Sequence, residues 1–274
     1  MSFVLARVMD RQWAEKFVEG EIFMRSLSDF GAWNVVKNKD DATLANNFRG
    51  DISEGAVKFI KNFEDDKLST IFSDDIKSVI KQARLIDNGI QYLNTLCLYC
   101  LQYDDKKKTF ELPSPQLKNF GDTAIVINFP NLFLQRLLKL LNNERKYMFL
   151  LNRVKYYLPD HTKLLDPLFN KTQSYSWQNE LRIAIGRLDM SKIACGDRFP
   201  LVETTDPLLL HIGSLRDIVQ MVPIADFISG NWNKKGVNLV NLTKNTDIYV
   251  QKIKATEQIM TNYMPSRVNL QFSI

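Results

Sequence analysis

The N-terminal segment alternates between apolar runs and polar breaks in a pattern that predicts strand, helix, strand. Residues 3–9 are mostly aliphatic, which favours a strand. Asp10 is a suitable N-cap for a short helix whose apolar residues recur at helical spacing, and Gly20 suits the position just after the helix. Residues 21–27 return to a strand pattern. The chain is therefore expected to open with two strands joined by one helix.

The middle of the chain predicts further strands and one long helix. Pro130 stands near the first position of that helix, where its missing N–H is tolerated, and leucines at helical spacing form its apolar face. An alternating apolar run also begins directly after Glu180. The predicted elements are strands over 91–101, 121–129, 154–157 and 181–185 and a helix over 130–144.

Strands with helices grouped between them favour an α+β fold with mainly antiparallel strands over a doubly wound sheet. Residues 37–56 have the composition of a loop, and residues 57–88 carry apolar residues at helical spacing among lysines and aspartates, which predicts one or two amphipathic helices. The expected organisation is a single domain over 1–274 with a helical insertion around 57–90 and an appended region around 190–274.

The composition is typical of a soluble globular protein. The chain has 274 residues, of which 45% are hydrophobic and 24% charged. Charge interrupts the N-terminal apolar run too early for a signal peptide, and three cysteines do not make a disulfide framework, so a cytoplasmic protein with no membrane partner is expected. The net charge of +5 permits contact with nucleic acid without requiring it.

Several classes of chemistry are disfavoured by the residue types present. The only histidines, His161 and His211, are not spaced as metal ligands with the cysteines, so no metal site is expected. Cys97 and Cys100 are three apart on a predicted strand, face opposite sides and are interpreted as core thiols. No glycine-rich dinucleotide loop or P-loop follows a strand. Chemistry is therefore expected from carboxylates, arginines, tyrosines and hydroxyls.

Glu180 is the carboxylate with the most informative context, because the polar, aromatic stretch SYSWQN delivers it to the start of a strand. One interpretation is a solvated carboxylate paired with Arg182, which lies two residues on and hence on the same face. The other is a catalytic carboxylate. A glutamate that accepts a hydrogen bond from a ribose hydroxyl stabilises the positive charge that develops as nicotinamide leaves, while an arginine binds phosphate or ribose and an aromatic ring stacks on nicotinamide.

A second group of residues, Arg49-Gly50-Asp51 followed by Glu54-Gly55, also allows two interpretations. It is a turn in which the glycines supply positive φ, or it presents Arg49 as a clamp for phosphate or ribose that is oriented by a neighbouring carboxylate.

Taken in order, these elements resemble the ADP-ribosyltransferase fold, and look most like nucleic-acid-directed toxins of the DarT type. The likeness rests on the opening unit, the Arg49 loop, the middle strand around Thr95, and Lys171 followed nine residues on by Glu180. Some uncharacterised phage and prophage proteins look similar. The Ser-Thr-Ser strand of the wider family is absent, and Asn94-Thr95-Leu96-Cys97 stands in its place.

The resemblance implies NAD as substrate and a role for several residues. Glu180 is the catalytic residue and Gln178 contacts the acceptor. Arg7 or Arg49 binds the dinucleotide, and Tyr99 and Trp177 are the aromatic candidates at the nicotinamide.

Two functions follow. The first is NAD-dependent ADP-ribosyl transfer to a macromolecule, nucleic acid or protein, of a kind used in phage–host conflict. The second is a non-catalytic interaction protein that keeps the scaffold and binds a phage or host macromolecule. The first predicts that Glu180→Ala or Glu180→Gln abolishes transfer and NAD hydrolysis and leaves the fold intact. The oligomeric state stays open.

Overall fold

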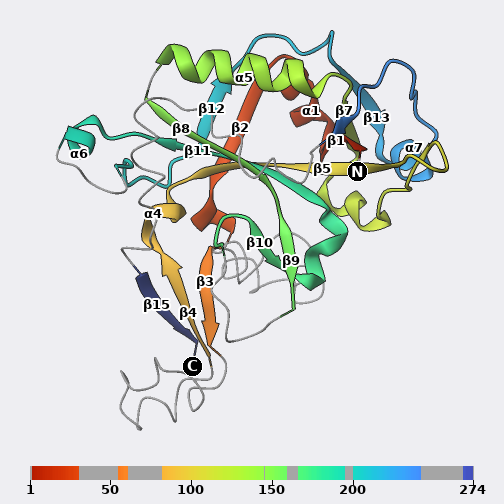
Figure 1. Ribbon diagram of the computed structural model, residues 1–274. Coiled ribbons are helices and arrows are strands. Elements are labelled where there is room, and N and C mark those ends of the chain that lie inside the picture. Colours follow the sequence, from red (N-terminus) through yellow and green to blue (C-terminus); the bar gives the residue numbers. More distant parts are fainter. Residues whose placement is uncertain are drawn as a thin grey trace.

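The protein has an α+β fold built on a large, mainly antiparallel sheet (Figure 1). The computed structural model describes residues 2–30, 55–60, 82–144, 146–158, 166–194, 200–241 and 268–273. The strands of the large sheet are β1 (Ser2–Met9), β2 (Glu21–Ser26), β5 (Asn94–Asp104), β6 (Thr109–Phe110), β7 (Thr123–Ile127), β8 (Tyr147–Arg153), β11 (Glu180–Arg187), β12 (Leu208–His211), β13 (Val219–Pro223) and β14 (Val240–Asn241).

Two smaller sheets and several helices complete the described architecture. The parallel pair of β9 (Lys155–Tyr157) and β10 (Asn170–Thr172) forms one small sheet, and β3 (Ala56–Ile60), β4 (Gln82–Asp87) and β15 (Val268–Ser273) form the other. The helices are α1 (Arg11–Val18), α4 (Asn88–Gln91), α5 (Pro130–Glu144), α6 (Met190–Ala194) and α7 (Ile224–Ser229), with 3-10 helices η4 (Pro115–Phe120) and η5 (Gln173–Gln178). No helix in these described segments has the length and apolarity to span a membrane.

Both faces of the large sheet are covered, which explains why its strands read as continuous apolar runs. Successive side chains of β1 belong to hydrophobic clusters on opposite faces of the sheet. Leu5 packs on the face covered by α1 and α5. On this face Phe17 and Phe133 stack, with ring centroids 6.0 Å apart. Ala6 packs on the other side, with η4 and α7. The strand–helix–strand opening unit and the helix over 130–144 are thus confirmed. Each of their elements is short enough for its own apolar pattern to identify it.

Strand β5 changes partner along one of its edges, and this change creates a fork in the sheet. β1 pairs with the C-terminal half of β5, from Ala6 opposite Tyr99 to Ser2 opposite Tyr103. β2 pairs only with its start, Arg25 opposite Thr95. The other edge of β5 pairs with β11 throughout this region. β1 and β2 therefore diverge from β5 around residues 96–98, with α1 connecting their far ends.

Gly20 fixes the end of α1 at the point where the chain turns into β2. Its φ is +93°, in the region that glycine tolerates best. A Cβ here would lie 2.0 Å from the carbonyl oxygen of Gly213, whose neighbour Ile212 donates its N–H to the Gly20 carbonyl. The prediction of a glycine just after this helix is confirmed, and close backbone approach adds a second reason for it.

The prediction of a helical insertion around 57–90 is wrong for the segments that the structure describes there, apart from the short α4. Residues 56–60 and 82–87 are strands β3 and β4, and β4 also pairs with β15 from the end of the chain. Apolar residues three apart fit a helix locally, but pairing with strands distant in sequence decides the outcome. Residues 61–81, and the predicted loop up to residue 54, lie outside the described residues.

The C-terminal part of the chain is not appended to the large sheet but belongs to it. β12 pairs with β2 at one end of the strand order and β13 pairs with β7 at the other, while β14 pairs with β1. The predicted boundary near residue 190 therefore does not separate this region from the fold. Sequence patterns also missed β8, whose apolar run precedes the short strand predicted at 154–157.

Candidate functional site

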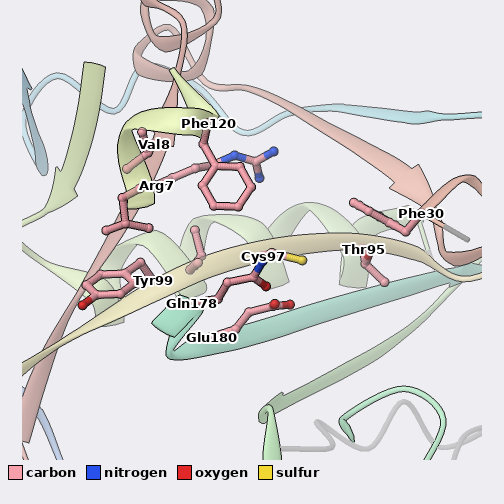
Figure 2. A pocket seen from close by; sticks show the side chains of 11 residues that line it. Arg7, Val8, Phe30, Thr95, Cys97, Tyr99, Phe120, Gln178 and Glu180 are labelled. Atoms are coloured by element: carbon pink, nitrogen blue, oxygen red, sulfur yellow. The ribbon is translucent and has the colours of Figure 1, made fainter. Parts of the chain in front are cut away.

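A cavity of about 180 Å³ lies at the fork in the sheet. Leu98 and Tyr99 both line it although they belong to clusters on opposite faces of the sheet, which places the cavity at the gap between β1 and β2. Its lining side chains are Arg7, Val8, Phe30, Thr95, Cys97, Leu98, Tyr99, Leu117, Phe120, Gln178 and Glu180 (Figure 2). In this view Arg7 and Phe120 lie on one side of β5, and Gln178 and Glu180 on the other.

The backbone before β11 places Gln178 and Glu180 beside each other. Helix η5 ends at Asn179, which has the left-handed values φ 37° and ψ 58°. Asn179 is fixed by its own hydrogen bonds: its side chain donates to the carbonyl of Cys100, and its carbonyl accepts from the Cys100 N–H at 2.8 Å. The Glu180 N–H donates to the Tyr156 hydroxyl at 2.9 Å. This turn is thus held from β5 on one side and β9 on the other.

The carboxylate of Glu180 is buried between two cations. Its Oε2 accepts from Lys171 Nζ at 2.7 Å, and its Oε1 accepts from Arg182 Nε at 2.9 Å. Lys171 also donates to Gln178 Oε1 at 2.9 Å, and Arg182 donates to the Leu168 carbonyl. The Glu180 side chain is 4% exposed. The predicted pairing with Arg182 is confirmed, whereas the interpretation of Glu180 as a solvated carboxylate is wrong.

The surrounding charges keep Glu180 ionised. Burial alone would raise the pKa of its carboxyl group, but the charges of Arg182 and Lys171 outweigh burial and lower that pKa well below the usual range. A carboxylate has about four lone-pair positions. The cations use one on each oxygen, and the Cys97 thiol also contacts the group. Because Glu180 lines the cavity, its remaining capacity is available to a ligand there.

Arg7 reaches the same cavity from β1. Its Nη1 is buried and has no hydrogen-bond partner among the described residues, and its guanidinium lies 6.0 Å from the ring centroid of Phe17. Burial lowers the pKa of Arg7, and the charge of Glu180 opposes that change. Thr95 is similar: its side chain lines the cavity, is 2% exposed, and its Oγ1 has no partner in the described part of the chain. Two residues that line this space therefore each carry a buried polar atom without a partner in the described part of the chain.

A larger cavity of about 560 Å³ adjoins the first and shares Arg7, Val8 and Phe120 with it. Two half-exposed aromatic rings, Trp13 at 51% and Phe23 at 44%, line this second cavity. Each ring makes a cation–π contact: Lys16 Nζ lies 5.0 Å from the ring centroid of Trp13, and the Arg25 guanidinium lies 5.8 Å from the ring centroid of Phe23. The second cavity thus combines flat apolar surface with charges of both signs, since Asp10 and Glu21 line it as well as these cations.

The other predicted site residues lie at different distances from the cavity. Tyr99 and Gln178 line it, and Glu180 stands directly opposite Tyr99 in the strand pairing. Trp177 stacks on Phe120 with ring centroids 5.6 Å apart, so that Phe120 and not Trp177 forms the wall. Arg49 lies outside the described residues.

Cys97 corrects another prediction, because only one of the two paired cysteines is a core thiol. Cys100 is fully buried in the main cluster, as predicted, whereas Cys97 is partly exposed and lines the cavity. Alternation along β5 sends the two thiols to opposite faces, and the face that carries Cys97 is the one opened by the fork. Burial, and then the charge of Glu180, raise the pKa of the thiol to about 12, although the charges of Arg182 and Lys171 oppose the change.

Sequence patterns assigned no site role to three residues that shape the site. Tyr156 and Lys171 sit on the small β9–β10 sheet, and Phe120 ends η4. The sequence shows only that Lys171 lies nine positions before Glu180, and this spacing does not indicate that the two residues form an ion pair. A lysine in the short polar strand Asn170–Thr172 gives no sign of burial, and Phe120 is distant in sequence from every other candidate.

Comparison with known proteins found no matching family model, no matching curated protein and no matching solved structure.

Proposed function

We propose that this protein is an NAD-dependent ADP-ribosyltransferase with an ADP-ribosyltransferase-like fold, in which Glu180 is the catalytic carboxylate and Arg7 binds the dinucleotide. One observation carries the proposal. An ionised, buried Glu180 and an Arg7 guanidinium with an unsatisfied nitrogen line the same cavity at a fork in the sheet. Buried polar groups are normally hydrogen-bonded, and an exception in a cavity wall is a reason to expect a ligand.

The low pKa of Glu180 favours an electrostatic role over that of a general base. A general base works best with a pKa near the operating pH, so Glu180 is a poor proton acceptor at neutral pH. It is suited instead to accept a hydrogen bond from a ribose hydroxyl and to stabilise positive charge on the ribose. In the transfer, the bond between ribose C1′ and the nicotinamide nitrogen breaks, and nicotinamide leaves with the electron pair. The acceptor's lone pair forms the new bond to C1′, and its proton passes to solvent.

The residues present fit an anionic dinucleotide. Arg7, Lys171 and Arg182 surround a single carboxylate, so the local charge is positive and complements two phosphate groups. Arginine is the residue best suited to phosphate oxygens, and Arg7 Nη1 has no competing partner among the described residues. Thr95 Oγ1 offers a second hydrogen bond. The two adjoining cavities give a combined space within the range of small-molecule sites.

The test is the melting temperature with and without NAD. A ligand that binds the folded state at 100 times its Kd stabilises it by about 2.7 kcal/mol, which raises the melting temperature of a protein of this size by several degrees. We expect this shift in the wild-type protein and its loss in Arg7→Met. Arg11→Met is the matched control, since Arg11 is exposed on α1 and paired with Glu15, and it should keep the shift.

Turnover is measured alongside, as release of nicotinamide from NAD in the presence of cell lysate. Labelled NAD followed by nuclease or protease digestion then identifies the class of acceptor. A wild-type protein that shows neither a shift in melting temperature nor nicotinamide release would refute the proposal.

A second candidate is a non-catalytic binding protein that keeps this scaffold. The observation that favours it is that each oxygen of Glu180 already accepts a hydrogen bond from a cation. In that case the Lys171–Glu180–Arg182 cluster is purely structural. The expected result is then a stable macromolecular partner in a pull-down, with no effect of NAD on the melting temperature.

A further inference from the structure

Strand β12 lies at one end of the strand order of the large sheet, where it pairs with β2 along one edge (Figure 1). In the described part of the chain no other strand pairs with β12, and no loop exchanges a backbone hydrogen bond with residues 208–211. The outer edge of this strand therefore presents backbone N–H and C=O groups that can pair with another strand.

The side chains beside this edge are apolar and about half exposed. Leu209 stands opposite Phe23 in the pairing of β12 with β2, so both side chains lie on the same face of the sheet. Leu209 is 47% exposed, and Phe23 and Trp13 line the same cavity as Leu209. Neighbouring large apolar side chains left open on one surface are characteristic of an interaction site, and the open edge lies directly beside them.

We infer that the outer edge of β12 pairs with the same edge of a second copy of this chain, which forms a symmetric dimer with Leu209 next to the two-fold axis. The two β12 strands run antiparallel in this arrangement, and the two large sheets join into one. Because Leu209 lines the second cavity, the partner's Leu209 extends the wall of that cavity. This inference goes beyond the proposed function and does not depend on NAD.

The alternation of side chains along β12 limits the register of this pairing. Two strands related by a two-fold axis perpendicular to the sheet keep the same face forward, so each outward side chain stands opposite an outward side chain of the partner. Placing Leu209 opposite the partner's Leu209 meets this condition. The row across the interface is then Phe23, Leu209, the partner's Leu209 and the partner's Phe23, so four apolar side chains cover one another.

The charges on this face suit a two-fold arrangement. Glu21 and Arg25 lie two residues to either side of Phe23 on β2, and hence on the same face of the sheet as Phe23. The two-fold axis reverses the strand direction, so Glu21 of one copy lies on the level of the partner's Arg25. The apolar row is therefore flanked on both sides by charges of opposite sign across the interface, and like charges are kept apart.

The strand at the other end of the sheet shows a protected edge for comparison. β13 ends in Pro223, which has no N–H to donate, and helix α7 follows directly and contacts the strand. Proline and a covering helix are two of the devices that keep sheet edges from pairing. Residues 208–211 contain neither a proline nor a charged lysine, arginine, aspartate or glutamate. Of these two end strands, β12 is therefore the one suited to pairing.

Sedimentation velocity over about 1–500 μM protein tests the inference, because a small interface is expected to dissociate in that range. We expect the full-length protein to approach twice the mass of one chain at the upper end. Leu209→Glu sets two like charges opposite each other at the axis and should weaken association at least about tenfold. Met221→Glu is the matched control, since it changes an exposed apolar side chain on β13, and it should leave association unchanged.

A cysteine at the axis tests the register independently. In a Cys195→Ser background, Leu209→Cys should form a disulfide-linked dimer under mild oxidation, since directly opposite residues of antiparallel strands have Cα atoms within disulfide range. Phe23→Cys is the control. Phe23 and the partner's Phe23 are three strand spacings apart, about 14 Å, which is too far for a disulfide, so this variant should run as a monomer on a non-reducing gel.

Three results would overturn the inference. The first is a wild-type protein that stays monomeric at about 500 μM. The second is an association that Leu209→Glu does not weaken, or that Met221→Glu weakens to the same extent. The third is cross-linking that is no greater in Leu209→Cys than in Phe23→Cys, and this result does not depend on whether Leu209→Glu folds.

Discussion

Lys171 Nζ lies 2.7 Å from Glu180 Oε2, and both side chains are less than a tenth exposed. The two residues belong to different sheets: Lys171 is on β10 of the small parallel pair, and Glu180 starts β11 of the large sheet. The small sheet thus supplies a counter-ion to the main candidate for catalysis. Buried charges are stable only when paired, so this contact bears on stability as well as on the proposed catalysis.

Replacing Lys171 by methionine should destabilise the protein markedly. Glu180 would keep Arg182 but lose one of its two buried partners, and we expect the free energy of unfolding to fall by about 2–3 kcal/mol. The measurement is urea unfolding at pH 7. Lys192→Met is the matched control, because Lys192 pairs with Glu203 at a more exposed site, and it should cost less than about 1 kcal/mol. Equal effects of the two changes would contradict the buried ion pair.

The free energy of unfolding should also fall in acid, because Glu180 becomes protonated there. Its pKa is lowered from 4.5 to about 2 in the folded protein, so its contribution is fully present above pH 4.5 and is lost as the pH falls toward 2. We expect Glu180→Gln to cost on the order of 2 kcal/mol at pH 7, and the difference from wild type to shrink by pH 3. Unfolding free energies at pH 7, 5 and 3 measure this. The expectation that Glu180→Gln leaves the fold undisturbed is thereby revised, because two buried cations lose their counter-ion.

Thr95→Val separates binding from stability. The Thr95 hydroxyl is buried and has no partner in the described part of the chain, so replacing it by a methyl group of similar shape should leave the free energy of unfolding unchanged within about 0.5 kcal/mol or raise it. If the hydroxyl binds the ligand, the same change should weaken the binding of NAD by about tenfold. Thermal melts with and without NAD give both numbers. A loss of 2 kcal/mol without NAD would show that the hydroxyl has a structural partner.

Cys97 should react slowly although it lines a cavity. With its pKa raised to about 12, only about one part in ten thousand is thiolate at pH 8, and the thiolate is the reactive form. In a Cys195→Ser background, we expect iodoacetamide to modify Cys97 about a thousand times more slowly than in the unfolded protein at pH 8. Mass spectrometry follows the reaction. A native rate near that of the unfolded protein would contradict the raised pKa.

Gly20→Ala should be among the most damaging single changes in the opening unit. Its Cβ would meet the Gly213 carbonyl oxygen at 2.0 Å, on a backbone that already has φ +93°, and we expect a loss of at least about 2 kcal/mol. Gly236→Ala controls for backbone conformation alone, since φ is +75° but no atom lies within 4 Å of the new Cβ. That change should cost about 1 kcal/mol. Chemical denaturation of both variants gives their free energies of unfolding. The difference between the two losses is the cost of the clash with the Gly213 carbonyl beyond the cost of the backbone conformation.

Local signals predicted the parts of the fold that a short window contains. In the opening unit and in the helix over 130–144, each element has its own apolar pattern. Gly20 follows the end of α1, and Pro130 stands at the start of α5. Sequence also identified Gln178 and Glu180, because the polar turn and the following strand are contiguous. Arg7 was a candidate by its place in the first strand, and it does line the cavity.

What the sequence could not provide was the arrangement of segments distant along the chain. The fork depends on β5 exchanging one partner for another, and nothing within β5 indicates where that happens. Phe120 and Lys171 reach the site through elements that are unremarkable in isolation. The apolar spacing in 57–60 suits a helix, and its strand conformation follows from pairing with β4.

The pairing of β15 with β4 affects the order in which this protein can be assembled. Residues 268–273 supply a strand to partners at 82–87, so the small sheet can be completed only when synthesis has passed residue 273. Domains usually begin to fold during translation, but one edge of β4 stays open until residues 268–273 have been made. A change that removes or delays residues 268–273 would therefore leave the edge of β4 exposed to pairing with other chains.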